Sequence, residues 1–278
     1  MSKVFKKYAK GNPDADLKVI SLGVGVQSTA VYLMSSMGYK LPRADYAIFA
    51  DTGAEYKKTM KLLEWLLKWQ KENDGVPIIV NRDKNLLDDI KKSYKDNTRV
   101  ASMPAYPESG GIIMRQCTYD YKIQPVIKTT RKLHRLKPKQ RMKPTEMWLG
   151  ISTDEIERMK DSGLYNIDYF YPLIYHSMSR TDCINFFKEN NFPVPIKSGC
   201  VFCPYHNNKE WANQKKYNYD EFKIAVDVDK MIRNNLIKKD KSDKLYLSSQ
   251  RKPLDEIDFE DNQLEMFDDF DCEGHCGL

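Results

Sequence analysis

The chain has 278 residues, of which 41% are hydrophobic and 30% are charged, and its formal net charge is +6. This length and composition predict one large domain with a substantial core, with or without an appendage at the C-terminal end. No run of about 18 apolar residues is present, and the N-terminal sequence MSKVFKKYAK lacks the apolar stretch of a secretory signal. A membrane partner is therefore not expected, and the expected location is cytoplasmic.

The first part of the chain is predicted to alternate strands with helices. A buried strand at 17–22 leads through a glycine turn into an apolar helix at 27–37. A second strand at 45–50 leads through a turn at 51–53 into an amphipathic helix, and VPIIVNR at 76–82 is a third strand. This alternation predicts an α/β fold with a doubly wound, mainly parallel sheet, whose ligands bind beyond the carboxyl ends of the strands.

The following elements are less regular. Residues 91–116 are weakly periodic and contain prolines and glycines, so they are interpreted as a long loop and a candidate lid. A helix is expected at 118–136, and EMWLGIS at 146–152 is a strand that ends in another glycine turn. A later helix is expected to begin at a capping residue, either Ser179 or Thr181.

Three consecutive regions are predicted from these elements. Residues 1–175 form a nucleotide-binding α/β domain, and residues 176–255 form a helical region with a cysteine motif that packs on the same domain. Residues 256–278 form an acidic tail that ends in a CEGHC motif.

Lysines and arginines concentrate in residues 128–143, which read KTTRKLHRLKPKQRMK. A basic stretch of this kind can contact nucleic acid or a polyanionic ligand. The alternative is that these side chains form an ordinary solvated helix face. tRNA or DNA is thus a candidate partner of this stretch.

The turn after the first strand reads SLGVGVQSTA and has features of an anion site. It places backbone N–H groups and the hydroxyls of Ser21, Ser28 and Thr29 at a helix N-terminus, where the helix dipole favours phosphate. The alternative is a tight turn that needs only small residues. The stretch is neither a Walker A loop nor a GxGxxG dinucleotide turn.

Six short motifs follow one another in a fixed order: this turn, FADTGAEYKKT, RQCTYDYKIQP, LGISTDEIERM, YPLI and SGCVFC. Together they resemble the PP-loop superfamily and, within it, the phosphoadenosine phosphosulfate (PAPS) reductase branch, over residues 19–206. The resemblance implies a Rossmann-like fold with a Cys-rich C-terminal extension and an adenine nucleotide bound at the glycine turn. The candidate nucleotide-binding residues are Ser21, Gly23, Gly25, Gln27, Ser28, Asp51, Thr52, Gly53, Arg115, Lys122, Gly150, Ser152, Asp154, Glu155 and Arg158.

One departure from the family concerns magnesium. Gln27 stands where ATP-pyrophosphatase members of the superfamily carry the aspartate of SGGxDS, which helps to hold Mg²⁺. A neutral amide can hydrogen-bond a phosphate or sulfate oxygen but cannot neutralise Mg²⁺. This favours a sulfonucleotide, PAPS or adenosine phosphosulfate (APS), over Mg-ATP, although Asp51 or Asp154 could supply the missing charge.

A second departure concerns anion binding. Ser152 stands where an arginine of the family often contacts the nucleotide. Arg115, Lys122 and Arg158 are the candidate replacements, because guanidinium groups bind sulfate and phosphate through two parallel hydrogen bonds.

The segment SGCVFCPYH suggests a metal site, since a chain without an export signal favours metal or redox chemistry over disulfides. Together with Cys117 it resembles the CC…CxxC pattern with which adenylylsulfate reductases hold a [4Fe-4S] cluster, with Thr118 in place of the second cysteine. The resemblance implies Cys117, Cys200 and Cys203 as ligands, with one iron open or bound by a fourth residue. The candidates for that fourth ligand are Cys183, Cys272 and Cys276.

The competing interpretation is a structural Zn²⁺ held by Cys200, Cys203, His206 and Cys117, which have acceptable spacing. Cys183 lies among apolar helical residues and is expected to be an ordinary core cysteine.

The terminal segment DCEGHCGL holds two further cysteines, and the imidazole of His275 can lower the pKa of the neighbouring Cys276 thiol. Its CGL is similar to part of the mobile ECGLH segment of PAPS reductases, whose cysteine attacks the sulfur of the nucleotide. The resemblance thus implies Cys276 or Cys272 as the catalytic residue. The alternative is a frayed tail.

Three functions are open at this point. The first is a PAPS-reductase-like enzyme of sulfur transfer or reduction, with an iron–sulfur cluster and a thiol reductant as partner. The second is ATP-dependent thiolation of tRNA or DNA, in which residues 128–143 bind phosphates. The third is a nucleotide-binding module that is stabilised by a structural Zn²⁺ and has no catalytic activity. A homodimer is a further candidate assembly.

Overall fold

The computed structural model describes residues 11–98, 103–234 and 243–259 of the chain. The chain divides into two compact units that interleave along the sequence, whereas the predicted regions were consecutive. We call them the sheet unit and the cysteine unit. The sheet unit comprises Met1–Ala50, Lys57–Asn81 and Gln124–Ser198, and the cysteine unit comprises Asp51–Tyr56, Arg82–Ile123 and Gly199–Leu278.

The sheet unit is built on a five-stranded sheet with the order β3-β2-β1-β5-β6. Every neighbouring pair is parallel, and Val19 in β1 is paired with Tyr46 on one side and Met147 on the other. Strand β2 is a continuous apolar run, YAIFA, and β5 is buried along its whole length, as expected for strands that are covered on both faces. The strands are β1 (Leu17–Ser21), β2 (Tyr46–Ala50), β3 (Ile78–Asn81), β5 (Thr145–Leu149) and β6 (Ile167–Phe170).

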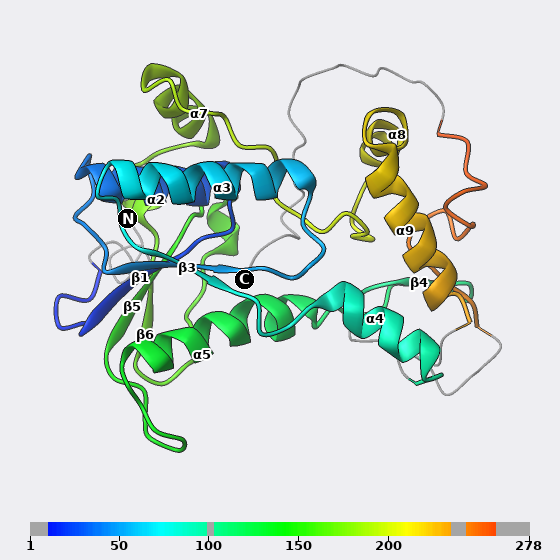
Figure 1. Cartoon of the computed structure of the whole chain (residues 1–278), viewed down its shortest axis with the longest axis horizontal. Helices are drawn as coiled ribbons and strands as arrows, with labels where there is room; N and C mark the ends of the chain where they lie inside the picture. Colours follow the sequence, from blue (N-terminus) through cyan, green and yellow to red (C-terminus); the bar gives the residue numbers. More distant parts are fainter. Residues whose placement is uncertain (1–10, 99–102, 235–242, 260–278) are drawn as a thin grey trace. The chain divides into compact units, whose positions relative to one another are not determined.

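Helices cover both faces of this sheet, which confirms the predicted α/β fold with a parallel sheet. Figure 1 shows α2 and α3 on one face and α5 on the other. Helix α7 packs against α2. The helices of the sheet unit are α2 (Val26–Met37), α3 (Lys57–Glu72), α5 (Gln124–Leu133), the 3₁₀ helix η2 (Thr153–Arg158), α6 (Pro172–Tyr175) and α7 (Arg180–Glu189).

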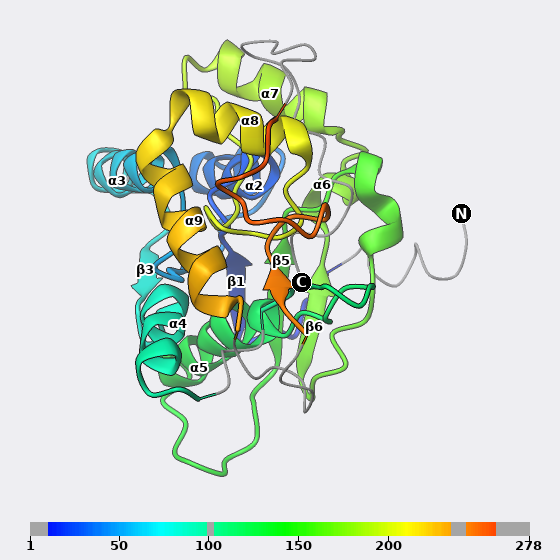
Figure 2. The same cartoon turned by 90° about the vertical axis from the view of Figure 1, so that its right-hand side faces the viewer.

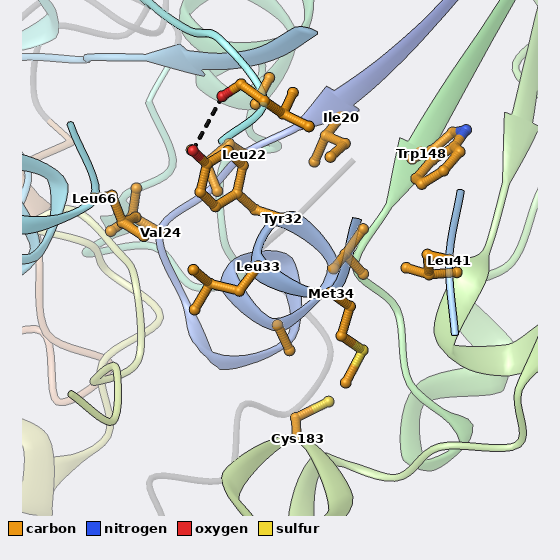
Figure 3. Packing of buried hydrophobic residues seen from close by; sticks show 14 of the residues in the cluster. Ile20, Leu22, Val24, Tyr32, Leu33, Met34, Leu41, Leu66, Trp148 and Cys183 are labelled. Carbon is orange, nitrogen blue, oxygen red and sulfur yellow. Dashed lines mark hydrogen bonds between the residues drawn. The ribbon is translucent and has the colours of Figure 1, made fainter. Parts of the chain in front are cut away.

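The core of the sheet unit lies between the sheet and α2, α3 and α7. Ile20, Tyr32, Leu66 and Trp148 are fully buried there (Figure 3). The Tyr32 hydroxyl donates a hydrogen bond to the Val76 carbonyl at 3.0 Å, so its one polar atom is satisfied inside the core. Burying each of these large side chains stabilises the fold by about 1.5–3 kcal/mol. The core therefore fixes the strand ends at which ligands bind in folds of this type.

Cys183 belongs to this core, as expected. It is fully buried in α7, its thiol lies beside Met34 (Figure 3), and burial raises its pKa to about 12. Of the two expected caps, Ser179 begins the helix: its hydroxyl accepts a hydrogen bond from the Asp182 N–H. Cys183 is thus held as a neutral thiol in a rigid element.

The cysteine unit consists of helices and a two-stranded antiparallel ribbon. Helix α9 packs against α4 and α8 (Figure 2), and its buried Asp229 accepts hydrogen bonds from the N–H groups of Leu247 and Leu254. These hydrogen bonds hold residues 243–259, the last described segment, against α9. The elements are α4 (Leu86–Lys95), β4 (Tyr106–Pro107), the π-helical turn η1 (Tyr119–Ile123), α8 (Asn208–Tyr217), α9 (Tyr219–Ile232) and β7 (Leu245–Tyr246).

The prediction of one long loop at 91–116 is partly wrong. Helix α4 extends through its first residues, because Asn85 caps the helix and Leu86 and Ile90 share a buried stripe. Strand β4 pairs with β7 farther along. The helix expected at 118–136 is present as η1 followed directly by α5. No helix in the described part of the chain is long and apolar enough to cross a membrane.

Candidate functional site

The first candidate site is the glycine turn between β1 and α2 in the sheet unit. The strand order reverses at β1, since β2 and β3 lie on one side and β5 and β6 on the other. In open α/β sheets, ligands bind at this reversal, outside the carboxyl ends of the strands. The predicted turn therefore lies where the fold places a ligand.

The backbone of this turn is strained. Val24 has a φ of 55°, in the left-handed region, although it is β-branched and fully buried. Such a conformation is unfavourable for valine and is found where the surrounding structure imposes it, often at ligand sites. The sequence does not predict a left-handed conformation at Val24, because in an ordinary turn a neighbouring glycine, Gly23 or Gly25, would adopt it.

The N–H groups of the turn converge on one oxygen. Those of Gly23 and Gly25 both donate to Ser28 Oγ, at 3.2 and 3.3 Å. Consecutive N–H groups around a left-handed residue form a concavity that binds anions, here at the N-terminus of α2. Ser21 ends β1 directly before this turn. Both N–H groups are satisfied by the Ser28 hydroxyl, so an anion and a tight turn of small residues both stay open as interpretations.

The turn after β5 meets the turn after β1. A Cβ on Gly150 would lie 2.5 Å from Ser28 N, so only glycine allows the two backbones to approach. Ser152 is buried at the start of η2, and its hydroxyl donates to Asp154 Oδ2 at 3.2 Å. The structure thus brings the two turns together at one end of the sheet, as predicted. Asp154 also accepts from the Arg180 N–H, so its carboxylate has local partners.

Three further predicted residues of the sheet unit form one network. The Gln27 amide donates to Glu155 Oε2 at 3.3 Å, and Arg158 pairs with Glu155 Oε1 at 2.5 Å. Both partners of the ion pair are largely buried. An aspartate at position 27 would face the Glu155 carboxylate, whereas the amide donates to it. The network therefore explains how a glutamine fits here.

The DTG turn after β2 belongs to the cysteine unit. Asp51 accepts from the Gly53 N–H at 2.9 Å and pairs with Arg82 at 3.1 Å. Gly53 has a φ of 70°, and a Cβ there would lie 2.3 Å from the Asn85 side chain. Gly53 is therefore required by the turn and by the cap of α4. Thr52, expected to contact nucleotide, is buried and directs its hydroxyl into the cysteine unit.

The second candidate site is formed by Cys117, Cys200 and Cys203, which are half-buried. The cysteine pair lies in two successive turns, with hydrogen bonds from the Cys203 N–H to the Cys200 carbonyl and from the His206 N–H to the Cys203 carbonyl, each 3.1 Å. A β-bridge joins Cys200 to Glu55. Segments that are far apart in sequence thus meet in one unit.

Burial and nearby charges set the protonation of two of these thiols. Burial, followed by the negative charge of Glu55, raises the pKa of Cys200 to about 12, although Lys122 acts in the opposite direction. Burial also raises the pKa of Cys117, partly offset by Arg115 and Lys122. Both thiols are therefore protonated at neutral pH, so metal binding here would release protons.

The histidine of the predicted zinc set has contacts within the cysteine unit. His206 Nε2 lies 3.1 Å from the Tyr56 hydroxyl, and its ring packs edge-on against Trp211. As the side chains stand, no group of three histidines, cysteines or acids among residues 11–98, 103–234 and 243–259 is arranged to hold a metal ion. The thiols must therefore draw together to bind one group.

Two predicted anion-binding residues of the cysteine unit have protein partners. Lys122 Nζ lies 3.4 Å from Glu55 Oε1, and the Arg115 guanidinium lies over the Tyr205 ring, 5.6 Å from its centre. Both cations flank Cys117, as the sequence predicted. Glu55 is the functional candidate that the sequence did not single out, because no local pattern marks an acid that becomes buried beside a distant cysteine.

The predicted catalytic residues Cys272 and Cys276, which are also candidates for the fourth ligand, lie outside the described residues, as does the cysteine-containing tail.

The sheet unit defines the chain as an α/β protein with a parallel, Rossmann-like sheet and a strained glycine turn at its strand reversal. Comparison with models of known protein families gives no match, and comparison with curated proteins gives none either.

Proposed function

We propose that the chain is an enzyme that binds an adenine nucleotide, a sulfonucleotide in preference to Mg-ATP, and carries out sulfur transfer or reduction. The observation that carries the proposal is the turn at Val24, whose left-handed backbone directs two N–H groups to one oxygen at a helix N-terminus. This geometry suits a sulfate or phosphate.

The preference for a sulfonucleotide follows from the network around Glu155. Both of its oxygens are engaged, one by Arg158 and one by Gln27. A Mg²⁺ ion needs oxygen ligands with negative charge, and neither Gln27 nor the paired Glu155 offers one without breaking these bonds. A sulfonucleotide, in contrast, needs no metal-binding carboxylate and can be bound by hydrogen-bond donors such as the N–H groups of the turn.

We further propose that Cys117, Cys200 and Cys203 hold a [4Fe-4S] cluster. A bound cluster would supply an iron that can bind a sulfur ligand in the cysteine unit. Arg115 and Lys122 add positive charge beside Cys117 and lower the cost of bringing thiolates together. The alternative, a Zn²⁺ held by the same cysteines, would make this site structural.

The reaction proposed for the tail follows from thiol chemistry. The thiolate of Cys276 or Cys272 attacks the sulfur of the sulfonucleotide, so that an S–S bond forms, the S–O bond to phosphate breaks and the nucleotide leaves. A dithiol reductant then attacks the tail sulfur, releases sulfite and becomes a disulfide once the tail thiol is restored. A thiol with a low pKa would make this attack feasible near neutral pH.

Binding measurements test this proposal. Anaerobically purified protein is titrated with PAPS, APS and ATP, each with and without Mg²⁺, and sulfite release is followed with a dithiol present. We expect a sulfonucleotide to bind without Mg²⁺ and to release sulfite. Tight binding of ATP only when Mg²⁺ is present, with no sulfite from either sulfonucleotide, would contradict it.

A second candidate function, thiolation of nucleic acid, is favoured by the surface of the sheet unit. Residues 128–143 carry eight lysines and arginines and no acidic residue. Arg131 donates to the carbonyls of Lys137 and Gln140, which gives the loop a fixed shape. Arg141 lies over the exposed Tyr165 ring, 5.5 Å from its centre. Fixed cations beside an exposed aromatic ring suit phosphates and an unpaired base.

Removing two cations of this loop tests the second candidate. In the double variant Lys137→Ala and Lys139→Ala, we expect tRNA affinity to fall and the slope of log K against log salt to become shallower by about 2. The control carries Lys58→Ala and Lys61→Ala in α3 and should bind like wild type. Equal salt slopes in all three proteins, measured by fluorescence anisotropy, would exclude this loop as the binding surface.

A further inference from the structure

Ser198 lies against the glycine turn between β1 and α2. It is the last residue of the sheet unit and the first residue of the SGCVFC motif. A Cβ on Gly25 would lie 2.9 Å from Ser198 Oγ, 3.5 Å from its Cβ and 3.6 Å from its backbone nitrogen. The Ser198 side chain therefore packs on the backbone of the turn, although the two residues are far apart in sequence.

This contact explains the glycine at position 25. Gly25 has a φ of −97° and a ψ of 177°, an extended conformation that any residue can adopt. Its backbone conformation therefore does not require glycine. Ser198 Oγ stands where a side chain at position 25 would have to go, so Gly25 is required for space. A hydroxyl from a distant segment thus replaces a side chain of the turn itself.

Two hydroxyls border the same small space beside Gly23. A Cβ on Gly23 would lie 3.6 Å from Ser28 Oγ and 3.8 Å from Ser198 Oγ. Ser28 Oγ accepts hydrogen bonds from the N–H groups of Gly23 and Gly25. Its own proton is donated to the Gly25 carbonyl at 3.4 Å, which is long for a hydroxyl donor. An anion in this space would meet hydroxyls from two segments together with the N–H groups of the turn.

The turn carries more hydroxyl donors than the protein itself uses. Ser198 is half-buried, and its hydroxyl makes no hydrogen bond to any residue in the described part of the chain. Thr29, in the first turn of α2, is fully buried, and its Oγ1 also lacks a partner within residues 11–98, 103–234 and 243–259. Buried polar groups are normally hydrogen-bonded, so these hydroxyls call for an explanation.

We propose that Ser198 is a further anion-binding residue of this turn, and that its hydroxyl donates a hydrogen bond to the sulfate or phosphate of the bound nucleotide. This inference rests on the proposed function, because it concerns the same turn. A hydrogen bond to a charged acceptor is stronger than one between neutral groups. Ser198 therefore contributes to nucleotide affinity while its hydroxyl contributes no hydrogen bond to the fold.

Ser198→Ala tests the assignment in the full-length chain, purified without oxygen and titrated calorimetrically without Mg²⁺. We expect its affinity for APS to be at least tenfold lower than that of wild type. AMP, which lacks the sulfate of APS, identifies the group that is bound. If the affinity for AMP also falls, Ser198 contacts the phosphate, and if it does not, Ser198 contacts the sulfate. The unfolding temperature should equal that of wild type, because the fold loses no hydrogen bond.

The matched control is Ser36→Ala, near the other end of α2. Ser36 Oγ accepts a hydrogen bond from the Val76 N–H at 3.0 Å, so this variant loses a hydrogen bond of the fold. We expect a lower unfolding temperature and wild-type nucleotide affinity. If Ser198→Ala behaves like this control, with reduced stability and unchanged affinity, its hydroxyl is structural and the proposal is overturned.

A double variant tests the contact between Ser198 and the turn without any nucleotide. In Gly25→Ala, the new methyl group would lie 2.9 Å from Ser198 Oγ, so the serine must move. In Gly25→Ala with Ser198→Ala, the nearest remaining atom is the Cβ of residue 198, at an ordinary 3.5 Å. Gly25→Ala should therefore lower the unfolding temperature less in the Ser198→Ala background than in wild type. Equal effects in the two backgrounds would show that Ser198 does not pack on the turn, and would overturn the proposal.

Failure of the proposed function gives a different result. If wild type binds ATP and neither APS nor AMP, the sulfonucleotide part of the proposed function fails, and the same comparison of variants is made with ATP. If wild type binds none of the three, the nucleotide site itself is wrong and the role of Ser198 is rejected with it. If wild type and Ser198→Ala bind APS equally tightly, the proposed function stands and only the role of Ser198 is overturned.

Discussion

Replacing Cys200 by serine is expected to abolish iron and sulfide retention, whereas Cys183→Ser should leave both unchanged. The two positions are well matched, because burial raises the pKa of each thiol to about 12. They differ in surroundings: Cys200 lies beside Glu55 and is coupled to Cys117, whereas Cys183 lies in the core of the sheet unit. A serine hydroxyl is a poor ligand for iron compared with thiolate.

Stability cannot explain the expected difference. Cys183→Ser buries a hydroxyl in an apolar core and should lower the free energy of unfolding by about 1–3 kcal/mol. The less stable control should thus keep the cluster while the Cys200 variant loses it. Iron, acid-labile sulfide and the absorption spectrum are measured on anaerobically purified proteins. Full iron and sulfide in Cys200→Ser, or loss of both from Cys183→Ser alone, would show that the cluster site has been misassigned.

The sheet unit could be predicted from the sequence because its signals are local. Strand β2 is an apolar run, β1 buries its Val19 and Ile20, glycine turns follow both strands, and the leucine stripe of α3 faces the core. Cys183 in the core and Ser179 as a cap follow from the same local patterns. Parallel order then places the turns at one end of the sheet, which is where the turns after β1 and β5 meet.

The chemistry of the site could not be predicted to the same degree, because it depends on contacts between distant segments. No periodicity indicates that Glu55 is buried beside Cys200, or that Gln27 donates to Glu155. The left-handed backbone of Val24 could not be predicted either, since the two neighbouring glycines are the residues expected to adopt that conformation. Helix α4 was missed because its polar residues obscured a short apolar stripe. The burial of Glu55, the Gln27 hydrogen bond, the Val24 backbone and helix α4 all depend on long-range packing and not on local propensity.

Gly150→Ala is expected to disrupt the sheet unit, whereas Gly23→Ala should not. A methyl group on Gly150 would lie 2.5 Å from Ser28 N and 2.6 Å from Ser28 Cα. Both atoms belong to the backbone of the first turn of α2, so relief requires β5 and α2 to move apart. Overpacking of this kind lowers the free energy of unfolding by about 1–3 kcal/mol.

Gly23→Ala provides the matched comparison, because the same methyl group there would meet only the hydroxyls of Ser28 and Ser198, at 3.6 and 3.8 Å. The fold should tolerate it within about 0.5 kcal/mol. The methyl group nevertheless enters the turn whose N–H groups are proposed to hold the anion, so sulfonucleotide affinity should fall at least tenfold, or about 1.4 kcal/mol. Urea unfolding and nucleotide titration of both variants separate the two effects. If Gly23→Ala has normal stability and normal nucleotide affinity, the turn is not part of the nucleotide site. If Gly150→Ala is as stable as wild type, the turns after β1 and β5 do not pack as closely as the structure places them.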